Sequence, residues 1–313
     1  MRFVTLEPVG IRTTALGLGC ASILGSVGAA QAHRALEMTF DAGIRHFDLA
    51  RSYGFGEAEV FFGRFARGKR EQLTIATKFG ILPSEAASRL ALIKPAARAA
   101  FSLFPRLRTA MRSRLEELAE SGKFEPKTAR QSVEASLKAL GTDYIDLLLM
   151  HDCRQGGFEP AAMQELAEDL KRAGKIRAFG LATSRDQTVA VLSERQLPVE
   201  VVQFGDNFLS WRNRPPLLHR VAVIRHSPFR FRLEDTDPAT VATVRRLLNE
   251  AGRDPTDPVV WRELSLAMAM HAQPRGPVVC SMFSPKHIAR NAQIADGGAF
   301  SEALLSAVTE AAA

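Results

Sequence analysis

The sequence predicts an α/β fold, a closed (β/α)8 TIM barrel, and three observations lead to this prediction. Short runs of aliphatic and β-branched residues alternate with longer amphipathic stretches along the whole chain. There are eight such runs, the number that closes a parallel barrel, and a length of 313 residues suits this fold. Each run is almost continuously apolar, which is typical of strands covered on both faces. A doubly wound sheet is the alternative, but no Gly-x-Gly-x-x-Gly follows the first run.

The elements of this barrel can be assigned in chain order. We expect strands at residues 15–20, 44–50, 73–78, 144–151, 176–182, 200–205, 221–226 and 277–282. Stretches of helical period lie between them, at residues 30–43, 56–68, 128–141 and 160–174, with others after residue 236. Several of these end on a glycine just after a basic last turn, as where Lys138 precedes Gly141, and this is a helix stop signal. We interpret the whole chain, residues 1–313, as one barrel domain.

Two long segments do not fit the simple alternation, and a short one precedes it. The residues before the first barrel strand are expected to form an N-terminal hairpin-like segment. Residues 81–127 are too long for an ordinary connection and have helical composition split at Pro105. We interpret them as a helical insertion over one end of the barrel, with an irregular excursion as the alternative. Residues 228–257 are polar and interrupted by prolines.

The composition excludes several classes of protein. Lys and Arg number 41 against 34 Asp and Glu, a net charge of +7, and 46% of residues are hydrophobic. A chain with this hydrophobic content and modest charge is not disordered. Its apolar runs fall far short of the roughly 20 residues that a transmembrane helix needs. The first residues also lack the apolar block of a signal peptide.

The cysteines and the basic residues suggest no special site. Cys20, Cys153 and Cys280 are too few for a disulfide framework and have no metal-ligand spacing, so we expect no metal and a cytoplasmic protein. The pI is near 9.7, with a basic excess in residues 98–114. No zinc-finger spacing or RNA-binding aromatic motif accompanies it, so we expect no nucleic-acid partner and no membrane partner. An excess of basic residues suits an anionic cofactor.

Polar residues at the carboxyl ends of the predicted strands are the candidates for catalysis, because these ends form the active-site mouth of such barrels. Asp48, Lys78 and His151 stand there, and Tyr53 follows on the loop after Asp48. An ammonium group beside a phenol favours the phenolate and lowers its pKa from about 10, and a carboxylate holds the ammonium in place. This set predicts Tyr53 as a general acid tuned by Lys78 and Asp48, with a neutral His151 orienting a carbonyl oxygen.

Three stretches of the chain resemble the aldo-keto reductases. HFDLARSYGFGEAEVFFGRFARGKREQLTIATKFG (46–80) is similar to the signature of that family. GTDYIDLLLMHD (141–152) is similar to its fourth strand with the catalytic histidine, and LGLG (16–19) to its first strand. The resemblance implies a metal-free barrel that transfers hydride reversibly between NADPH, or less often NADH, and an aldehyde or ketone. The family's catalytic tetrad falls on Asp48, Tyr53, Lys78 and His151.

The resemblance also implies a cofactor site and a substrate pocket. The residues that it assigns to the cofactor are Gly19, Cys20, Asp48, Thr183, Gln203, His226, Ser227, Pro228, Ser281, Ser284, His287, Arg290 and Asn291. For a small-molecule carbonyl substrate, the loops at the same rim suggest an apolar pocket mouth beside His151, although aromatic loop residues also pack against the barrel. Its residues are Ile23, Phe55, Phe79 and Trp211. Neither the substrate itself nor an oligomeric state follows from the sequence.

Several of these positions differ from the family pattern. Ala182 and Thr183 replace a Ser-Asn pair that binds the nicotinamide carboxamide, and His226 replaces a tyrosine that stacks on the ring. Ser281 and His287 stand where basic residues grip the 2′-phosphate of NADPH. Lys286 and Arg290 lie close enough in sequence to substitute for them, or belong to a solvated helix face.

The differences leave two other functions open. A cofactor-binding sensor or assembly subunit with little turnover would retain the barrel and lose some cofactor contacts. A sugar-phosphate isomerase or lyase would need a phosphate-binding glycine pair near the last strands, which the sequence lacks. Such an enzyme would also leave the four candidate catalytic residues unexplained.

Overall fold

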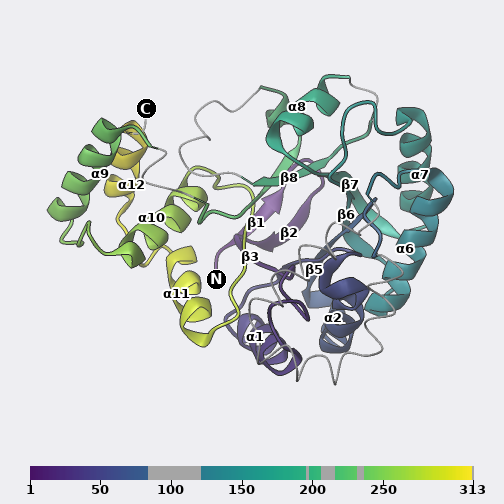
Figure 1. Cartoon of the computed structure of the whole chain (residues 1–313), viewed down its shortest axis with the longest axis horizontal. Helices are drawn as coiled ribbons and strands as arrows, with labels where there is room; N and C mark the ends of the chain where they lie inside the picture. Colours follow the sequence, from purple (N-terminus) through teal and green to yellow (C-terminus); the bar gives the residue numbers. More distant parts are fainter. Residues whose placement is uncertain (84–120, 195–196, 206–215, 231–235, 312–313) are drawn as a thin grey trace, which may run out of the picture.

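The computed structural model describes residues 1–83, 121–194, 197–205, 216–230 and 236–311. Eight parallel strands close into a barrel in the order β10-β3-β4-β5-β6-β7-β8-β9, with helices around the outside (Figure 1). The barrel strands are β3 (Leu16–Gly19), β4 (His46–Asp48), β5 (Thr74–Phe79), β6 (Ile145–His151), β7 (Ile176–Ala182), β8 (Val201–Gly205), β9 (Ala222–His226) and β10 (Val278–Cys280). Each falls within or within one residue of its predicted range, so the prediction of a (β/α)8 barrel is confirmed.

Most of the outer helices follow from amphipathic stretches of the sequence, and several have a start or stop signal. They are α1 (Ala29–Asp41), α2 (Ala58–Ala66), α6 (Pro126–Leu140), α7 (Pro160–Arg172), α8 (Arg185–Ser193), α9 (Pro238–Glu250), α10 (Pro258–His271), α11 (Pro285–Ala295) and α12 (Glu302–Ala311). Five of them begin with proline, whose missing N–H costs nothing in the first turn. Gly141 ends α6 in the left-handed conformation, as its position after Lys138 predicts.

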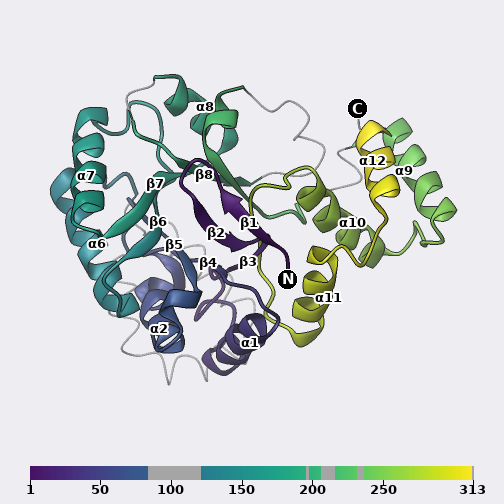
Figure 2. The same cartoon turned by 180° about the vertical axis from the view of Figure 1, so that it is seen from behind.

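The N-terminal hairpin closes the amino-terminal end of the barrel (Figure 2). Strands β1 (Phe3–Leu6) and β2 (Ile11–Thr14) pair antiparallel, as the sequence predicts. Leu6 and Ile11 are fully buried in the cluster of apolar side chains that fills the barrel interior. The Thr13 hydroxyl lies 3.3 Å from Nδ1 of His46, at the start of β4. The hairpin therefore seals one end of the barrel and leaves the other for a site.

The two long segments that interrupt the predicted alternation differ in how much of each the structure describes. Residues 84–120, most of the predicted helical insertion, lie outside the described residues. The chain that follows them returns to the barrel at Phe124, whose ring packs at 6.0 Å against that of Phe79. The polar segment at 228–257 contains a helix, α9, because Asp237 caps its first turn and Pro238 starts it. In Figure 1, α9 and α12 lie together on one side of the barrel, beyond α10.

The segment between β8 and β9 differs from the simple alternation of strand and α-helix. The described residues after β8 contain a short 3-10 helix, η4 (Pro216–Arg220), before β9 begins. Gly180 in β7 is required by its neighbour, because a Cβ there would lie 1.8 Å from the carbonyl oxygen of Val201.

No helix in the described part of the chain combines the length and apolar character needed to cross a bilayer.

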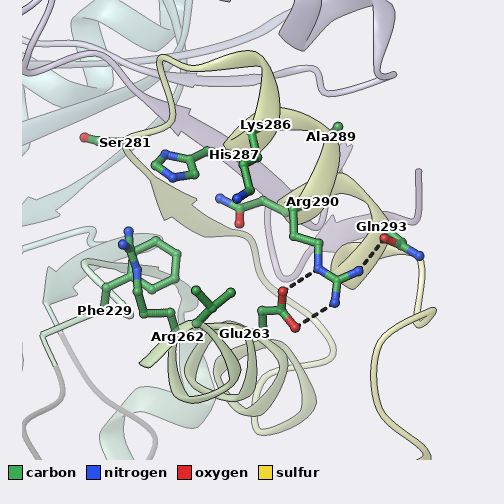
Figure 3. A pocket seen from close by; sticks show the side chains of 11 residues that line it. Phe229, Arg262, Glu263, Ser281, Lys286, His287, Ala289, Arg290 and Gln293 are labelled. Carbon is green, nitrogen blue, oxygen red and sulfur yellow. Dashed lines mark hydrogen bonds and ion pairs between the residues drawn. The ribbon is translucent and has the colours of Figure 1, made fainter. Parts of the chain in front are cut away.

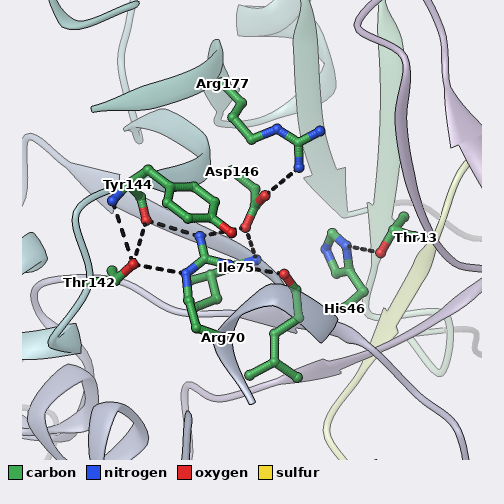
Figure 4. Close-up of polar contacts among 9 residues, drawn as sticks. Thr13, His46, Arg70, Ile75, Thr142, Tyr144, Asp146 and Arg177 are labelled. Carbon is green, nitrogen blue, oxygen red and sulfur yellow. Dashed lines mark hydrogen bonds and ion pairs between the residues drawn. The ribbon is translucent and has the colours of Figure 1, made fainter. Parts of the chain in front are cut away.

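A buried carboxylate ties three elements together near the start of β6 (Figure 4). Asp146 is fully buried and accepts hydrogen bonds from Arg70 at 2.8 Å, Arg177 at 2.7 Å and the backbone N–H of Ile75 at 2.9 Å. The Arg70 guanidinium also lies 3.8 Å from the ring centroid of Tyr144. Both carboxylate oxygens are satisfied, so this network fixes the register of β5, β6 and β7 at their amino ends.

We predict that Asp146→Ala destabilises the protein by about 3–5 kcal/mol, because it removes the partner of the largely buried Arg70 guanidinium and of the buried backbone N–H of Ile75. Equilibrium urea unfolding measures this change. Asp169→Ala is the matched control, since Asp169 also binds two arginines, Arg130 and Arg172, but at the helix surface. Its free energy of unfolding should stay close to that of the wild type. Equal losses in both variants would contradict the assigned role of Asp146.

Candidate active site

Four side chains converge at the carboxyl ends of β4, β5 and β6. Asp48 is the last residue of β4, Lys78 the penultimate residue of β5 and His151 the last residue of β6. Ala76 and Leu149 lie in the interior cluster, so Lys78 and His151, two residues further along each strand, also face inward. Tyr53 begins the 3-10 helix η1 (Tyr53–Gly56) on the loop that follows β4. The structure therefore brings together the four residues that the sequence singles out.

The centre of the site is a buried ion pair. The Lys78 ammonium lies 2.5 Å from Oδ1 of Asp48, 2.7 Å from the carbonyl oxygen of Leu49 and 3.3 Å from the Tyr53 hydroxyl. Lys78 is 2% exposed and Asp48 4%. Burial alone would lower the pKa of Lys78, but the charge and hydrogen bond of Asp48 outweigh it and the pKa is raised. Lys78 is therefore a fixed positive charge beside the phenol.

The Tyr53 phenol responds to two opposing influences. Burial raises the pKa of Tyr53 above its ordinary value, and the nearby Lys78 ammonium opposes this without reversing it. Lys78 thus acts on the pKa of Tyr53 in the predicted direction, but desolvation of the phenolate is the larger effect. The hydroxyl keeps its proton at neutral pH. It is thus in the form that a general acid requires.

The two residues after Tyr53 have left-handed backbone conformations. The residues that follow it, Gly54 and Phe55, have positive φ values of 59° and 60°. A Cβ on Gly54 would lie 2.7 Å from the carbonyl oxygen of Ile23, so glycine is needed here. Phe55 adopts the left-handed region without that freedom, a conformation that persists only where the surroundings enforce it. Strain of this kind is typical of functional loops.

His151 provides a neutral polar group opposite the phenol. Its ring stands edge-on to that of Tyr53, with centroids 6.1 Å apart and an interplanar angle of 84°. Burial, and then the positive charge of Lys78, lower the pKa of His151 to about 3. The imidazole is therefore uncharged at neutral pH and can donate one hydrogen bond.

A cavity of about 720 Å³ opens over these four residues. The residues predicted for the cofactor that line it are Gly19, Asp48, Thr183, Gln203, His226, Ser227, Pro228 and Ser281. Gln203 fits a nicotinamide carboxamide: its amide nitrogen donates to Oδ1 of Asp48 at 3.0 Å, while its buried Oε1 has no partner among the described residues. A buried acceptor of this kind requires a donor from a ligand or water.

The two altered positions at this rim have local partners. Thr183 donates to the carbonyl oxygen of Cys153 at 2.9 Å. Nδ1 of His226 lies 2.9 Å from the Ser227 hydroxyl, and Ser227 has a positive φ of 58°. Burial lowers the pKa of His226, so its ring presents a neutral flat face at pH 7.

A second cavity, of about 390 Å³, lies between α10 and α11 (Figure 3). It shares Ser281 and Phe229 with the first cavity, so the two adjoin. The predicted cofactor residues Ser281, His287, Arg290 and Asn291 line it. Ser284 instead caps α11 by accepting from the backbone N–H of His287 at 3.3 Å. Arg290 is bound to Glu263 rather than extended into the cavity.

Other predicted positions lie away from the cavities. Cys20, Ile23 and Phe79 are buried in the core and are absent from the lining, and Phe55 is half-buried on the strained turn. Trp211 lies outside the described residues. Within the described part of the chain, no group of three or more His, Cys, Asp or Glu side chains is arranged to hold a metal ion.

Sequence reasoning missed several lining residues. Asp152, Arg185 and Arg230 face the catalytic cavity, and Val259, Arg262 and Glu263 face the second one. Asp152 directly follows His151, which is a usable signal. The sequence gives no such signal for the α10 residues, because the neighbours of a helix face are known only once the chain has folded.

Known proteins resemble this chain in sequence and in fold. Pyridoxal 4-dehydrogenase of Microbacterium luteolum is 31% identical over 205 residues, 59% of this chain and 56% of its own length. L-glyceraldehyde 3-phosphate reductase of Escherichia coli K12 is 31% identical over 224 residues, 67% of this chain and 54% of its own. The matches thus span little more than half of these curated relatives. An aldo-keto reductase of Bacillus halodurans, solved in its holo form, superposes with a TM-score of 0.72 at 21% identity, covering 99% of this chain and 96% of that one.

The family comparison covers most of the barrel. The model of the aldo/keto reductase family matches residues 15–223, from the first barrel strand into the seventh. This match includes all four of the residues that converge at the catalytic cavity. The chain belongs to the aldo/keto reductase family.

Proposed function

We propose that this protein is an NAD(P)H-dependent reductase that converts an aldehyde or ketone to an alcohol. The observation that carries the proposal is the Tyr53 hydroxyl, protonated and 3.3 Å from the Lys78 ammonium, at the edge of a cavity large enough for a reacting carbonyl. Family membership and relatives named as reductases support carbonyl reduction in general.

The side chains divide the chemistry among them. NAD(P)H, when bound, supplies the hydride that reduces the carbonyl carbon. Tyr53 gives its hydroxyl proton to the carbonyl oxygen, so that an alcohol is released and a phenolate remains. The Lys78 ammonium stabilises this phenolate, and Asp48 keeps that ammonium charged and in place. Solvent then returns the proton to Tyr53.

His151 positions the substrate in this scheme. A carbonyl oxygen between the Tyr53 hydroxyl and the His151 ring receives a hydrogen bond from each. Because His151 stays neutral, it adds no charge that would compete with Lys78. The two groups together fix the oxygen and leave the carbon open to attack from the side of Gln203 and His226.

The nucleotide would occupy both cavities. The Oε1 of Gln203 would accept a hydrogen bond from the nicotinamide carboxamide, and the neutral ring of His226 lines the same cavity. The sequence resemblance favours NADPH over NADH. A relative named NADH-specific methylglyoxal reductase, from Escherichia coli, is 30% identical over 194 residues, so the family alone does not settle the choice.

The substrate class and location follow from the same evidence. The relatives are named for pyridoxal and for L-glyceraldehyde 3-phosphate, and we propose a small-molecule carbonyl compound here. The three cysteines are free and buried, which suits a cytoplasmic protein.

Tyr53→Phe should lower kcat by roughly 10²–10⁴-fold, because it removes the proton donor and keeps the ring. Steady-state reduction of an aldehyde panel measures the loss, and fluorescence titration should show unchanged nucleotide binding. Tyr144→Phe is the matched control, since Tyr144 is the chain's other tyrosine and packs on Arg70 instead. Wild-type turnover in Tyr53→Phe would refute the mechanism. Nucleotide binding without turnover in the wild type would favour the sensor function.

The rate of reduction should not change with pH between about 6 and 9, and should fall only at higher pH. The reaction needs protonated Tyr53, and burial raises the pKa of this phenol above about 10. His151 is already neutral throughout this range because burial lowers its pKa. A profile of kcat against pH tests this, and a rate that decreases from pH 6 to pH 8 would contradict it.

Gln203→Leu should weaken binding of either nucleotide by about tenfold, because it removes the buried acceptor for the carboxamide. Fluorescence titration measures the dissociation constants without turnover. Gln164→Leu, at an exposed side chain of α7 that lines neither cavity, serves as the control. Unchanged binding in Gln203→Leu would exclude this assignment of the carboxamide.

A further inference from the structure

A second buried carboxylate lies behind the catalytic residues and has no part in the chemistry described so far. Glu59 stands in the first turn of α2, which packs against the outside of the barrel beside β5 (Figure 1). Its two oxygens accept hydrogen bonds from Nη1 of Arg51 at 3.0 Å and from the Thr77 hydroxyl at 2.6 Å. None of these three side chains lines either cavity. Glu59 can therefore affect the reaction only through its neighbours.

Both partners of Glu59 lie next to catalytic residues in the chain. Thr77 directly precedes Lys78 in β5, and successive side chains of a strand point to opposite faces, so Thr77 faces α2 while Lys78 faces the site. Arg51 lies on the loop that follows β4, two residues before Tyr53, and its backbone N–H donates to the carbonyl oxygen of Lys78 at 3.4 Å. Glu59 thus joins this loop to β5 at the level of Lys78.

Tyr53 is the catalytic group that most needs such a support. Asp48 and Lys78 belong to β4 and β5, which are hydrogen-bonded neighbours. Tyr53 stands on a loop instead, and its hydroxyl lies 3.3 Å from the Lys78 ammonium, whereas Asp48 lies 2.5 Å from it. A contact of the longer kind weakens with a small movement of the loop. The ion pair between Arg51 and Glu59 restrains that movement.

The burial of this ion pair suits a restraint on geometry. The side chains of Glu59 and Arg51 are 1% and 17% exposed, so little water can replace either partner. A buried ion pair adds little to stability once its lost hydration is counted, but it holds two charged groups in one arrangement. The Thr77 hydroxyl occupies Oε1 of Glu59 and leaves Oε2 for Arg51. The carboxylate is therefore held between the strand and the loop in a single orientation.

We infer that Glu59 is a positioning residue for proton transfer, which keeps the Tyr53 hydroxyl beside the Lys78 ammonium. It acts through Arg51, which anchors the loop, and through Thr77, which ties the carboxylate to β5. The effect on turnover rests on the proposed function. The placement of Tyr53 can be measured without turnover.

Glu59→Gln tests the inference, because it keeps the shape of the side chain and removes its charge. In the full chain, kcat for reduction of an aldehyde panel should fall roughly 10- to 100-fold, while nucleotide dissociation constants from fluorescence titration change by less than about twofold. Thr77→Val removes one hydrogen bond to the carboxylate and should lower kcat in the same direction. Thr77→Ser retains the hydroxyl and should keep the wild-type kcat.

The ionisation of Tyr53 gives a second readout, independent of turnover. The chain has two tyrosines, so in a Tyr144→Phe background the ultraviolet absorbance of phenolate reports Tyr53 alone. Burial raises the pKa of Tyr53 and Lys78 opposes this rise, so a hydroxyl that has moved away from Lys78 should ionise at higher pH in Glu59→Gln. Loss of a nearby negative charge would by itself shift the ionisation to lower pH, which separates the two effects.

Asp146→Asn is the matched control. Asp146 is an equally buried carboxylate that binds arginines at the other end of the barrel. Its variant should lower the melting temperature and leave kcat and the ionisation of Tyr53 unchanged.

The outcomes separate positioning from a structural role. Lower kcat, unchanged nucleotide binding and ionisation of Tyr53 at higher pH support the inference. A Glu59→Gln variant that loses only stability, or whose Tyr53 ionises at lower pH, overturns it. If Glu59→Gln does not fold, the two Thr77 variants decide by the same measurements. If the wild type reduces no carbonyl compound, the proposed function fails, and the titration of Tyr53 alone decides whether Glu59 positions it.

Discussion

The buried ion pair between Lys78 and Asp48 is the constraint on which the rest of the site depends. Two charges that are 2% and 4% exposed lose most of their hydration, and a contact of 2.5 Å, with a backbone carbonyl as second acceptor, must offset that loss. A buried pair of this kind is weak evidence for stability. Its value lies in fixing a positive charge beside Tyr53. The barrel supplies the rigid frame, since β4 and β5 are hydrogen-bonded neighbours.

The two ends of the barrel use buried carboxylates for different purposes. At the amino end, Asp146 is saturated by Arg70, Arg177 and a backbone amide, so it has no capacity for chemistry. At the carboxyl end, Asp48 accepts hydrogen bonds from Lys78 and Gln203. The Oε1 of Gln203 has no partner among the described residues, so it can still accept a hydrogen bond. Satisfied polar groups hold the fold, and incompletely satisfied ones mark the site.

The cavity between α10 and α11 shows how contacts between two helices decide which side chains are available. Arg290 occupies a position expected to contact the cofactor, yet Glu263 of α10 binds both sides of its guanidinium. Arg262, the residue before Glu263 on the same helix, lines the cavity. Both contacts depend on α10 and α11 packing side by side.

The sequence by itself determined the eight strands, most of the outer helices and the four converging residues, because each depends on local order along the chain. It did not predict α8. A strand of fixed period places Lys78 and His151 on the inner face, and a parallel barrel brings all strand ends to one rim. The direction of the Tyr53 pKa shift was not accessible in this way, since burial depends on every neighbour. The tertiary structure alone decided that Glu263 binds Arg290 and that Arg262 faces the second cavity. These contacts join residues 27 positions apart or more, on helices whose relative placement is fixed only by packing against the barrel.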